Sequence, residues 1–522
     1  MVTFLYVLAL LLAAQHAQAD LPIHALIRDI AGKWRFHKTQ PLGGLDVTCG
    51  SDMPNTVEGN LMLGNYLEYL RDHFVLEGSS DFELTLDLTA YADSSNKRNR
   101  QQWRALAVKD SEGNTVGRWT SVYDQGFEVL LNDGTRYFFY MHFTKQEGDH
   151  YETNVHSTHI GWAYTTETSN SAETIRRCAY GHKLDGKRRE TTAIVKLLSN
   201  DVKDKYRQID RAIKNGSWEI APAGKGQVKQ KKGSYPCNCS NMEKLNFYDN
   251  IPRAFQWKDK VSLKVDNQKH CGNCYAIASR YVLQSRFLIA LERMQGLTAE
   301  QKMALQELSQ FPFDDSDATT CDMFNQGCKG GYPYLTGKRM REFGLLTKNH
   351  ANGQCSVLSQ QRRYFAKDYG YVGGCYQCTA CQGEQLIMRE VFANGPVVTA
   401  MDASVMSDDY DGTVITFDGE RTNAGICDVK DHPILSGWEY TSHAVVIVGW
   451  DEQVIDGQLV KYWICRNSWG EEWGEHGYFK IERGKNLFGI ESEAVFIDPD
   501  LTRFTQKPNS ALLHDVHNHI KT

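Results

Sequence analysis

The stretch that decides the fold is Gln268-Lys-His-Cys-Gly-Asn-Cys-Tyr-Ala-Ile-Ala-Ser279, which leads directly into an apolar segment ending near Met294. Apolar residues fall on nearly every face of that segment and no proline precedes Gly296, so we predict a buried helix with Gly296 as its C-terminal cap. Backbone N–H groups and the helix dipole at a helix start favour negative charge, which lowers the pKa of a cysteine thiol there. Cys274 is therefore a candidate nucleophile, but a Cys-x-x-Cys pair by itself is equally well explained as two disulfide partners.

The composition is that of an ordinary globular protein from an oxidising compartment. The chain has 522 residues, of which 41% are hydrophobic and 23% charged, so it is long enough to form several domains with cores of their own. Its formal net charge of -6 argues against nucleic acid as the main partner. The 14 cysteines suit the secretory route better than the cytosol.

The N-terminus predicts a secretory signal peptide over residues 1–19. An apolar run from Phe4 to Ala14 is followed by Ala17-Gln-Ala19, which places cleavage before Asp20. The run is too short for a membrane-spanning helix. A retained membrane anchor is the alternative, and after signal removal we expect no membrane association.

Residues 20–183 have the pattern of an antiparallel β-barrel. Apolar and polar residues alternate from Phe82 to Thr89, which predicts a half-buried strand. Two further apolar stretches flank Asn132-Asp-Gly134, a strong hairpin signal. The block contains two cysteines, Cys49 and Cys178, which can pair across it, and it has no candidate catalytic cluster.

Residues 184–250 change in character and are interpreted as a propeptide or linker. Apolar residues at helical spacing predict a helix over 203–218. The lysine- and glycine-rich run at 223–233 is interpreted as a solvated segment where the chain can be cut, in preference to a polyanion site. Asn215 and Asn238 are candidate glycosylation acceptors.

The chemistry lies in residues 251–499. A run rich in β-branched residues, Tyr440-Thr-Ser-His-Ala-Val-Val-Ile-Val-Gly-Trp450, predicts a buried strand with His443 near its start, and a second apolar strand ends on Asn467. Alone, such a histidine is usually structural and such an asparagine is usually a turn residue. A cysteine at a helix start, then a histidine, then an asparagine beside tryptophan together point to catalysis.

These stretches resemble the papain-type cysteine peptidases. The residues that match in family order are Gln268, the Cys-Gly-Asn-Cys-Tyr run, Cys328-Lys-Gly-Gly331, Ser442-His-Ala444, Gly449 and Asn467-Ser-Trp-Gly470. The resemblance implies an α+β catalytic domain with a helical half and a β-barrel half. His443 follows Cys274 at a wider spacing than the roughly 130–150 residues of papain, which indicates insertions around 360–381 and 407–436.

The same resemblance implies a role for each residue. Cys274 as a thiolate attacks a peptide carbonyl, and protonated His443 gives its proton to the leaving amine. Asn467 orients the His443 ring and Trp469 shields their hydrogen bond, while Gln268 and the Cys274 backbone N–H form the oxyanion hole. Gly330, Gly331 and Trp469 are expected to contact the substrate, and no metal is expected.

A second resemblance, to the cathepsin C (dipeptidyl peptidase I) family, covers most of the chain. It rests on Asp20-Leu-Pro22, Asp29-Ile-Ala-Gly32 with Trp34, Gly126-Phe-Glu-Val-Leu-Leu-Asn-Asp133, Gly331-Tyr-Pro-Tyr-Leu335 and Tyr371-Val-Gly-Gly374. It implies that the N-terminal barrel is an exclusion domain that blocks the cleft beyond two residues. The Asp20 carboxylate would then hold the substrate's free α-amine in a charge-assisted hydrogen bond, so the enzyme would remove dipeptides from free N-termini.

Two other functions fit the sequence. The N-terminal domain can leave the cleft open, which would give an endopeptidase, with Asp20 a frayed terminal residue. The chain can also be a binding protein built on an inactive peptidase scaffold, although the intact Gln268, Cys274, His443 and Asn467 argue against this.

The cathepsin C resemblance implies a cofactor and partners as well. A chloride ion in the second specificity pocket would be held by the backbone N–H of Tyr332 and the hydroxyls of Tyr334 and Tyr371. An activating protease would remove 184–250 and cut within 428–441. A lysosome-like compartment and a homotetramer are further expectations.

Family pairing implies the disulfides Cys49–Cys178, Cys271–Cys328 and Cys321–Cys355, with Cys274 free. Cys465 lies within an apolar strand and is predicted to be an unpaired core thiol. No partner is assigned to Cys237, Cys239, Cys375, Cys378, Cys381 and Cys427. For the Cys-x-x-Cys-x-x-Cys run among them, extra disulfides are favoured over a metal site.

Three features depart from the family. Ala25 stands where the family has a cysteine, and an insertion lies around 72–104, so the barrel's role in a tetramer is in question. Residues 500–522 extend beyond the family's end and are interpreted as a polar tail, despite three histidines that could suggest a metal site.

Overall fold

The computed structural model describes most of two regions of the chain. These are residues 25–185 and 251–504 together with 195–196, apart from gaps at 26, 43–48, 50–65, 78–81, 92–104, 124, 146–149, 167–173, 259–262, 352–354, 356–361, 373–382, 404–405, 407–409, 417–440, 456, 485 and 492. The predicted signal peptide, Asp20, the helix over 203–218, the glycosylation acceptors and the tail beyond 504 lie outside the described residues. So do the six cysteines without an assigned partner.

The N-terminal region forms a closed antiparallel barrel. Its closed circuit runs through β1 (Gly32–Lys38), β2 (Phe82–Ala90), β3 (Leu106–Lys109), β4 (Thr115–Val122), β5 (Gly126–Leu131), β6 (Arg136–Lys145), β8 (Gly161–Thr166) and β9 (Thr174–Lys183). β9 pairs back onto β1, with Trp34 opposite Lys183, and this pairing closes the barrel. The predicted antiparallel barrel is confirmed.

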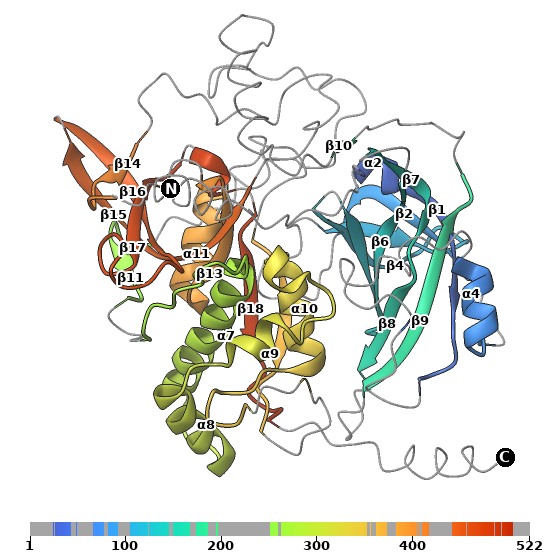
Figure 1. The fold of residues 1–522 in the computed structure, drawn as a ribbon, viewed down its shortest axis with the longest axis horizontal. Coiled ribbons are helices and arrows are strands. Elements are labelled where there is room, and N and C mark those ends of the chain that lie inside the picture. The colour runs from blue at the N-terminus through green and yellow to red at the C-terminus, as the bar shows by residue number, and fades with distance from the viewer. Residues whose placement is uncertain are drawn as a thin grey trace, which may run out of the picture.

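Smaller elements complete this domain. β7 (His150–Thr158) pairs with β6 and β9, and β10 (Val195–Lys196) pairs with β7. The short helices α2 (Ile27–Ile30) and α4 (Tyr66–His73) flank the strands (Figure 1). The predicted hairpin is the β5–β6 connection, where Gly134 has a φ of +88°, a backbone conformation that glycine adopts at little cost.

The C-terminal region has helices on one side and a mostly antiparallel sheet on the other. Its helices are α7 (Cys274–Arg293), α8 (Ala299–Gln310), α9 (Asp315–Thr319), α10 (Pro333–Phe343) and α11 (Glu384–Asn394), with 3-10 turns η1 (Gly327–Lys329) and η4 (Leu487–Gly489). The strands are β11 (Phe255–Gln256), β12 (Ala366–Tyr371), β13 (Val397–Met401), β14 (Val414–Ile415), β15 (His443–Ile455), β16 (Gln458–Arg466), β17 (Tyr478–Glu482) and β18 (Val495–Pro499). The predicted α+β class is confirmed.

The helix predicted from the opening stretch is α7, which is buried on nearly every face. Its apolar side chains pack on β15 and β18 and on helices α8 to α10. One detail of the prediction is wrong, because the C-cap is Met294 in an extended conformation, and Gly296, with a φ of +73°, lies in the turn beyond it. No helix in the described part of the chain is long and apolar enough to cross a membrane.

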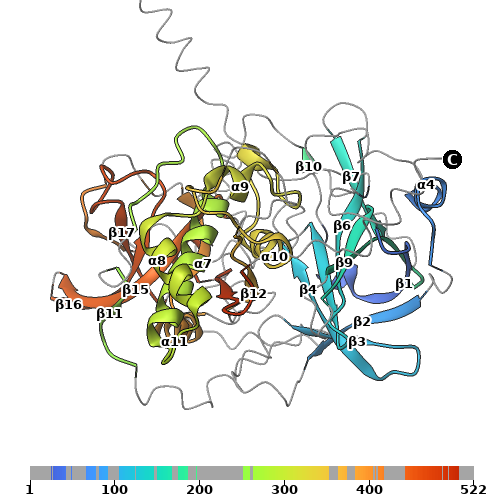
Figure 2. The same cartoon turned by 90° about the horizontal axis from the view of Figure 1, so that it is seen from below.

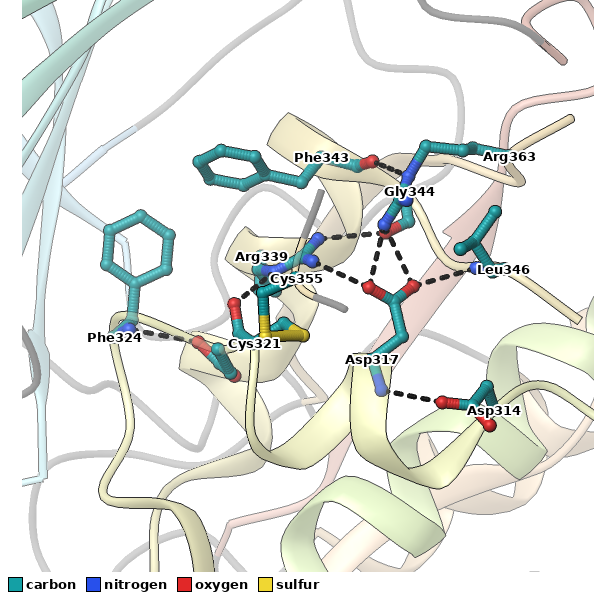
Figure 3. Close-up of polar contacts among 11 residues, drawn as sticks. Asp314, Asp317, Cys321, Phe324, Arg339, Phe343, Gly344, Leu346, Cys355 and Arg363 are labelled. Atoms are coloured by element: carbon teal, nitrogen blue, oxygen red, sulfur yellow. Dashed lines mark hydrogen bonds and ion pairs between the residues drawn. A yellow bond between two sulfur atoms is a disulfide. The ribbon is translucent and has the colours of Figure 1, made fainter. Parts of the chain in front are cut away.

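The buried carboxylate of Asp317 ties three segments of the helical half together (Figure 3). It accepts hydrogen bonds from Arg339 on α10 at 3.1 Å, from Arg363 at 2.8 Å to each oxygen, and from the backbone N–H of Leu346 at 2.8 Å. Asp314 caps the first turn of α9 by accepting from the Asp317 backbone N–H. A single side chain thus fixes the positions of α9, α10 and the segment after α10 relative to one another.

Helix α10 lies on the side of the C-terminal domain that faces the barrel, as both views show (Figures 1 and 2). Arg136 of β6 forms an ion pair with Asp368 of β12 at 2.8 Å across this boundary. The Arg176 guanidinium lies 3.7 Å from the centre of the Phe343 ring at the end of α10. The two domains therefore meet along α10 and the strand β12.

Candidate active site

Cys274 is the first residue of α7 and is half-buried with a free thiol. The helix has no acidic residue in its first turn, and the Asn273 side chain at the N-cap bonds Thr319 instead of the helix. Backbone N–H groups of the first turn therefore keep their attraction for negative charge. The backbone N–H of Ala444 also donates to the Cys274 Sγ, at 3.4 Å.

Two neighbouring strands bring the histidine and the asparagine together. His443 begins β15 and Asn467 directly follows β16, and these strands pair antiparallel with Val446 opposite Arg466. His443 Nε2 lies 2.8 Å from Asn467 Oδ1, which also accepts from the Ser468 backbone N–H. The Asn467 amide is thus fixed in position, and it orients the His443 ring.

Each of the two reacting side chains changes the pKa of the other. Burial alone would raise the pKa of Cys274, but the charge of His443, its hydrogen bond and two backbone N–H contacts lower it below the ordinary thiol value. Burial alone would lower the pKa of His443, but the charge and hydrogen bond of Cys274 and the bond to Asn467 raise it. The arrangement favours a thiolate beside an imidazolium.

Trp469 and Gln268 flank this pair. The Trp469 ring centre lies 5.2 Å from that of His443, so it covers the imidazole. The Gln268 Oε1 accepts from the Ser468 hydroxyl at 2.6 Å, and its Nε2 donates to the Cys271 carbonyl at 3.0 Å. An amide nitrogen carries two hydrogens, and the oxyanion role predicted for Gln268 would use the one that is not donated to Cys271.

A disulfide fixes the neighbouring loop to the start of α7. Cys271 and Cys328 are joined by an S–S bond of 2.02 Å. The Gly272 N–H donates to the Cys328 carbonyl at 2.8 Å, and the Tyr275 hydroxyl donates to the Gly327 carbonyl at 3.0 Å. The structure also contains the disulfides Cys49–Cys178 and Cys321–Cys355, and leaves Cys274 and the buried Cys465 free.

The two glycines expected to contact substrate follow Cys328. Gly330 has a φ of +123°, and a Cβ on Gly331 would lie 2.5 Å from the Asn325 Oδ1, so glycine is required at both positions. The Asn325 Oδ1 accepts from the Tyr332 backbone N–H at 2.7 Å, and its Nδ2 donates to Asp322 at 2.7 Å. Sequence reasoning missed Asn325, since nothing in a lone loop asparagine marks it as the support of a glycine pair.

The barrel packs against this same loop. Tyr123, in the turn between β4 and β5, stacks on Tyr332 with ring centres 5.5 Å apart. The Tyr140 hydroxyl donates to the Phe324 carbonyl at 2.6 Å, and the Trp162 ring lies edge-on to Phe324 at 5.3 Å. These barrel residues were also missed, because no local pattern in the barrel strands indicates a contact with a loop so distant in sequence.

The residues predicted to hold chloride do not fit that ion in this arrangement. The Tyr332 N–H donates to Asn325, as described above, and the Tyr334 hydroxyl donates to a carboxylate oxygen of Glu128 at 2.9 Å. Tyr371 stacks on Tyr334 with ring centres 4.9 Å apart. Two of the three expected donors therefore already serve other acceptors.

Comparison with known proteins agrees with this geometry. A model described as "Papain family cysteine protease" matches residues 251–497, and one described as "Cathepsin C exclusion domain" matches residues 20–183. A "Cysteine protease" of Blomia tropicalis is 30% identical over 48% of this chain and 67% of its own length. The chain belongs to the papain family of cysteine proteases. Its barrel is the exclusion domain of the cathepsin C type, so the predicted family is confirmed.

Two relatives of this papain-family protease extend over both domains. "Dipeptidyl aminopeptidase 1" of Plasmodium falciparum is 26% identical over 96% of this chain and 97% of its own length. "Cathepsin C" of Schistosoma mansoni is 27% identical over 75% of this chain and 85% of its own length. The likeness therefore includes the exclusion domain as well as the catalytic domain.

We expect a bell-shaped dependence of kcat/KM on pH. The rate should rise as pH passes the lowered pKa of Cys274, where the thiolate forms, and fall as pH passes the raised pKa of His443, where the imidazolium is lost. Alkylation of the thiol by iodoacetamide measured across pH reports the first step without turnover. In His443→Ala the alkylation midpoint should move up toward the ordinary thiol value of about 8.5. An unchanged midpoint in that variant would contradict the thiolate–imidazolium pair.

Proposed function

We propose that this chain is a cysteine-type dipeptidyl aminopeptidase, which removes dipeptides from the free N-termini of peptides and proteins. The names of the two relatives that extend over both domains support this activity. The observation that carries it is the docking of the exclusion domain on the loop that contains Gly330 and Gly331, through Tyr123 and Tyr140. A domain at that place limits how much chain can extend past the nucleophile.

The proposed reaction is acyl transfer through the Cys274 sulfur. The thiolate attacks the carbonyl of the second residue, so a C–S bond forms and the carbonyl oxygen becomes an oxyanion facing Gln268 and the Cys274 N–H. As the C–N bond breaks, the imidazolium of His443 gives its proton to the leaving amine. Water then attacks the thioester, His443 takes a proton from it, and the dipeptide leaves as Cys274 returns to thiolate.

The Asn467 side chain would act throughout by holding the imidazole. Its Oδ1 accepts the Nε2 hydrogen of His443, which leaves the other ring nitrogen for Cys274. Trp469 covers the ring and would keep water from competing for this bond. No step of the reaction needs a metal or chloride.

A dipeptide amide with a free α-amine, compared with the same substrate acetylated, tests the proposed specificity. The mature protein should cleave the free form and leave the acetylated form uncut. Asp20→Ala should lose about 10- to 100-fold in kcat/KM on the free form, because a charge-assisted bond to the ammonium contributes about 1.5–3 kcal/mol. Cys274 alkylation by iodoacetamide should stay unchanged in that variant.

Equal cleavage of both substrates by the wild-type protein would instead favour a papain-family endopeptidase. Absence of cleavage by fully processed protein would favour an inactive scaffold. Since Asp20 lies outside the described residues, N-terminal sequencing of the mature chain is needed to establish that it is the first residue.

We further propose the division of the chain into a signal peptide (1–19), an exclusion domain (20–183), a propeptide or linker (184–250), a peptidase domain (251–499) and a tail (500–522). The disulfide-bonded cathepsin-type domains support passage through the secretory pathway to a lysosome-like vesicle. An activating protease and a homotetramer are proposed from the family resemblance. Sequencing of the mature fragments would locate the cuts made by an activating protease. Light scattering would measure the oligomeric state.

A further inference from the structure

A carboxylate of the exclusion domain lies buried among side chains of the catalytic domain. Glu128, on β5, is 3% exposed. Its Oε1 accepts from the Tyr334 hydroxyl on α10 at 2.9 Å, and its Oε2 accepts from the Tyr369 hydroxyl on β12 at 2.5 Å. One carboxylate thus bonds two tyrosines from two elements of the other domain.

Both tyrosine hydroxyls keep their protons beside this group. Burial first, and then the charge of Glu128, raise the pKa of Tyr334 and of Tyr369 well above the ordinary phenol value. Each hydroxyl has one hydrogen to donate, and both hydrogens point to Glu128. Neither hydroxyl has a second hydrogen for another anion.

The two cations next to Glu128 already have carboxylate partners. Arg136 donates to Glu128 at 3.1 Å and pairs with Asp368 at 2.8 Å. The Lys338 ammonium lies 3.8 Å from Glu128 and pairs with Glu342 at 2.5 Å. Arg136 and Lys338 thus each pair with Glu128 and with one further carboxylate, so both cations have anionic partners without a chloride.

We propose that Glu128 serves as a built-in anion that holds Tyr334 and Tyr369 in place of a bound chloride, so that docking of the exclusion domain positions the start of α10 and the enzyme works without halide. Glu128 is a positioning residue, because it acts on the loop that contains Gly330 and Gly331 through Tyr334, two residues after Tyr332. The link to substrate specificity rests on the proposed aminopeptidase function.

The wild-type protein, assayed in chloride and in gluconate buffers of equal ionic strength, tests whether the enzyme works without halide. We expect the same kcat/KM and the same thermal unfolding midpoint in both. A rise in the unfolding midpoint or in kcat/KM that saturates with chloride would overturn the proposal. Because the unfolding measurement needs no substrate, it stands even if the acetylated-substrate test rejects the aminopeptidase function.

The variant Glu128→Ala tests whether the Glu128 carboxylate holds Tyr334 and Tyr369 in position. Removal of the carboxylate leaves two buried hydroxyls without their acceptor and Arg136 with Asp368 alone, and we expect kcat/KM to fall about 10- to 100-fold as the tyrosines shift. Chloride or acetate should restore part of the loss and raise the unfolding midpoint of this variant, although neither affects the wild type. Full activity of Glu128→Ala in gluconate would overturn the proposal.

Glu83→Ala is the matched control for Glu128→Ala. Glu83 lies in the same barrel and pairs with Lys33 and Arg35, but those ion pairs are partly exposed and do not reach the catalytic domain. Its activity should remain at the wild-type value in every buffer. If Glu128→Ala does not fold, Glu128→Gln keeps the shape and one acceptor oxygen, and it should still lose activity in gluconate and regain it in chloride.

Discussion

Replacing Cys274 with alanine is expected to abolish turnover, with a loss in kcat on the order of 10⁶-fold, the size seen when the nucleophile of a catalytic triad is removed. The thiol begins α7, its pKa is lowered by His443, and no other described free cysteine lies beside a histidine. The measurement is the hydrolysis of a dipeptide amide by fully processed protein. Substrate binding should persist, since the variant removes only the sulfur.

Cys465→Ala is the matched control for this loss. Cys465 is the other free cysteine in the described part of the chain, and it is buried in β16, where burial raises its thiol pKa well above the ordinary value. A protonated, buried thiol is not a nucleophile. Cys465→Ala should therefore keep turnover close to wild type, and an equal loss in both variants would contradict the assignment of Cys274.

Replacing Asp317 with alanine should give the largest loss of stability, about 3–5 kcal/mol in the free energy of unfolding of the catalytic domain. Asp317 is 5% exposed and accepts from Arg339, Arg363 and the Leu346 backbone (Figure 3). Without it, two buried guanidinium groups lose their counter-charge. Urea unfolding followed by tryptophan fluorescence measures the change.

Asp315→Ala provides the comparison. Asp315 also pairs with an arginine, Arg280, at 2.5 Å, but its side chain is 42% exposed and Arg280 has a second carboxylate partner in Asp266. Partly exposed ion pairs contribute about 1 kcal/mol or less. If both variants lost the same stability, the burial of Asp317 would not be the cause.

Local patterns in the sequence predicted the elements that carry the reacting groups. The helix start at Cys274, the strand that begins at His443 and the strand that ends before Asn467 each have a periodicity or β-branched run that specifies them locally. The closed barrel follows in the same way from alternating strands and the Asn132-Asp-Gly134 turn. The prediction of Gly296 as the C-cap is wrong because the last turn of α7 closes two residues earlier. There the Met294 backbone N–H donates to the Leu291 carbonyl, and this bond needs no glycine.

Contacts between segments distant in sequence could not be predicted in this way. The prediction of the chloride donors rests on the family pattern, and only packing of the barrel against α10 brings the Glu128 carboxylate to the Tyr334 hydroxyl. The support of Tyr332 by Asn325 and the stacking of Tyr123 on Tyr332 likewise come from the folded arrangement. None of these pairs has a spacing that a periodic pattern would reveal.

The sequence by itself determined the two domain types and the identity of Cys274, His443 and Asn467 as a set, because each lies in a locally specified element and their order along the chain is distinctive. Only the tertiary structure decided how the exclusion domain meets the loop that contains Gly330 and Gly331 and which group provides negative charge beside Tyr334. The physical reason is that buried hydrogen bonds and ion pairs between domains depend on distance in space and on the exclusion of water, and neither is encoded by the spacing of residues along one strand or helix.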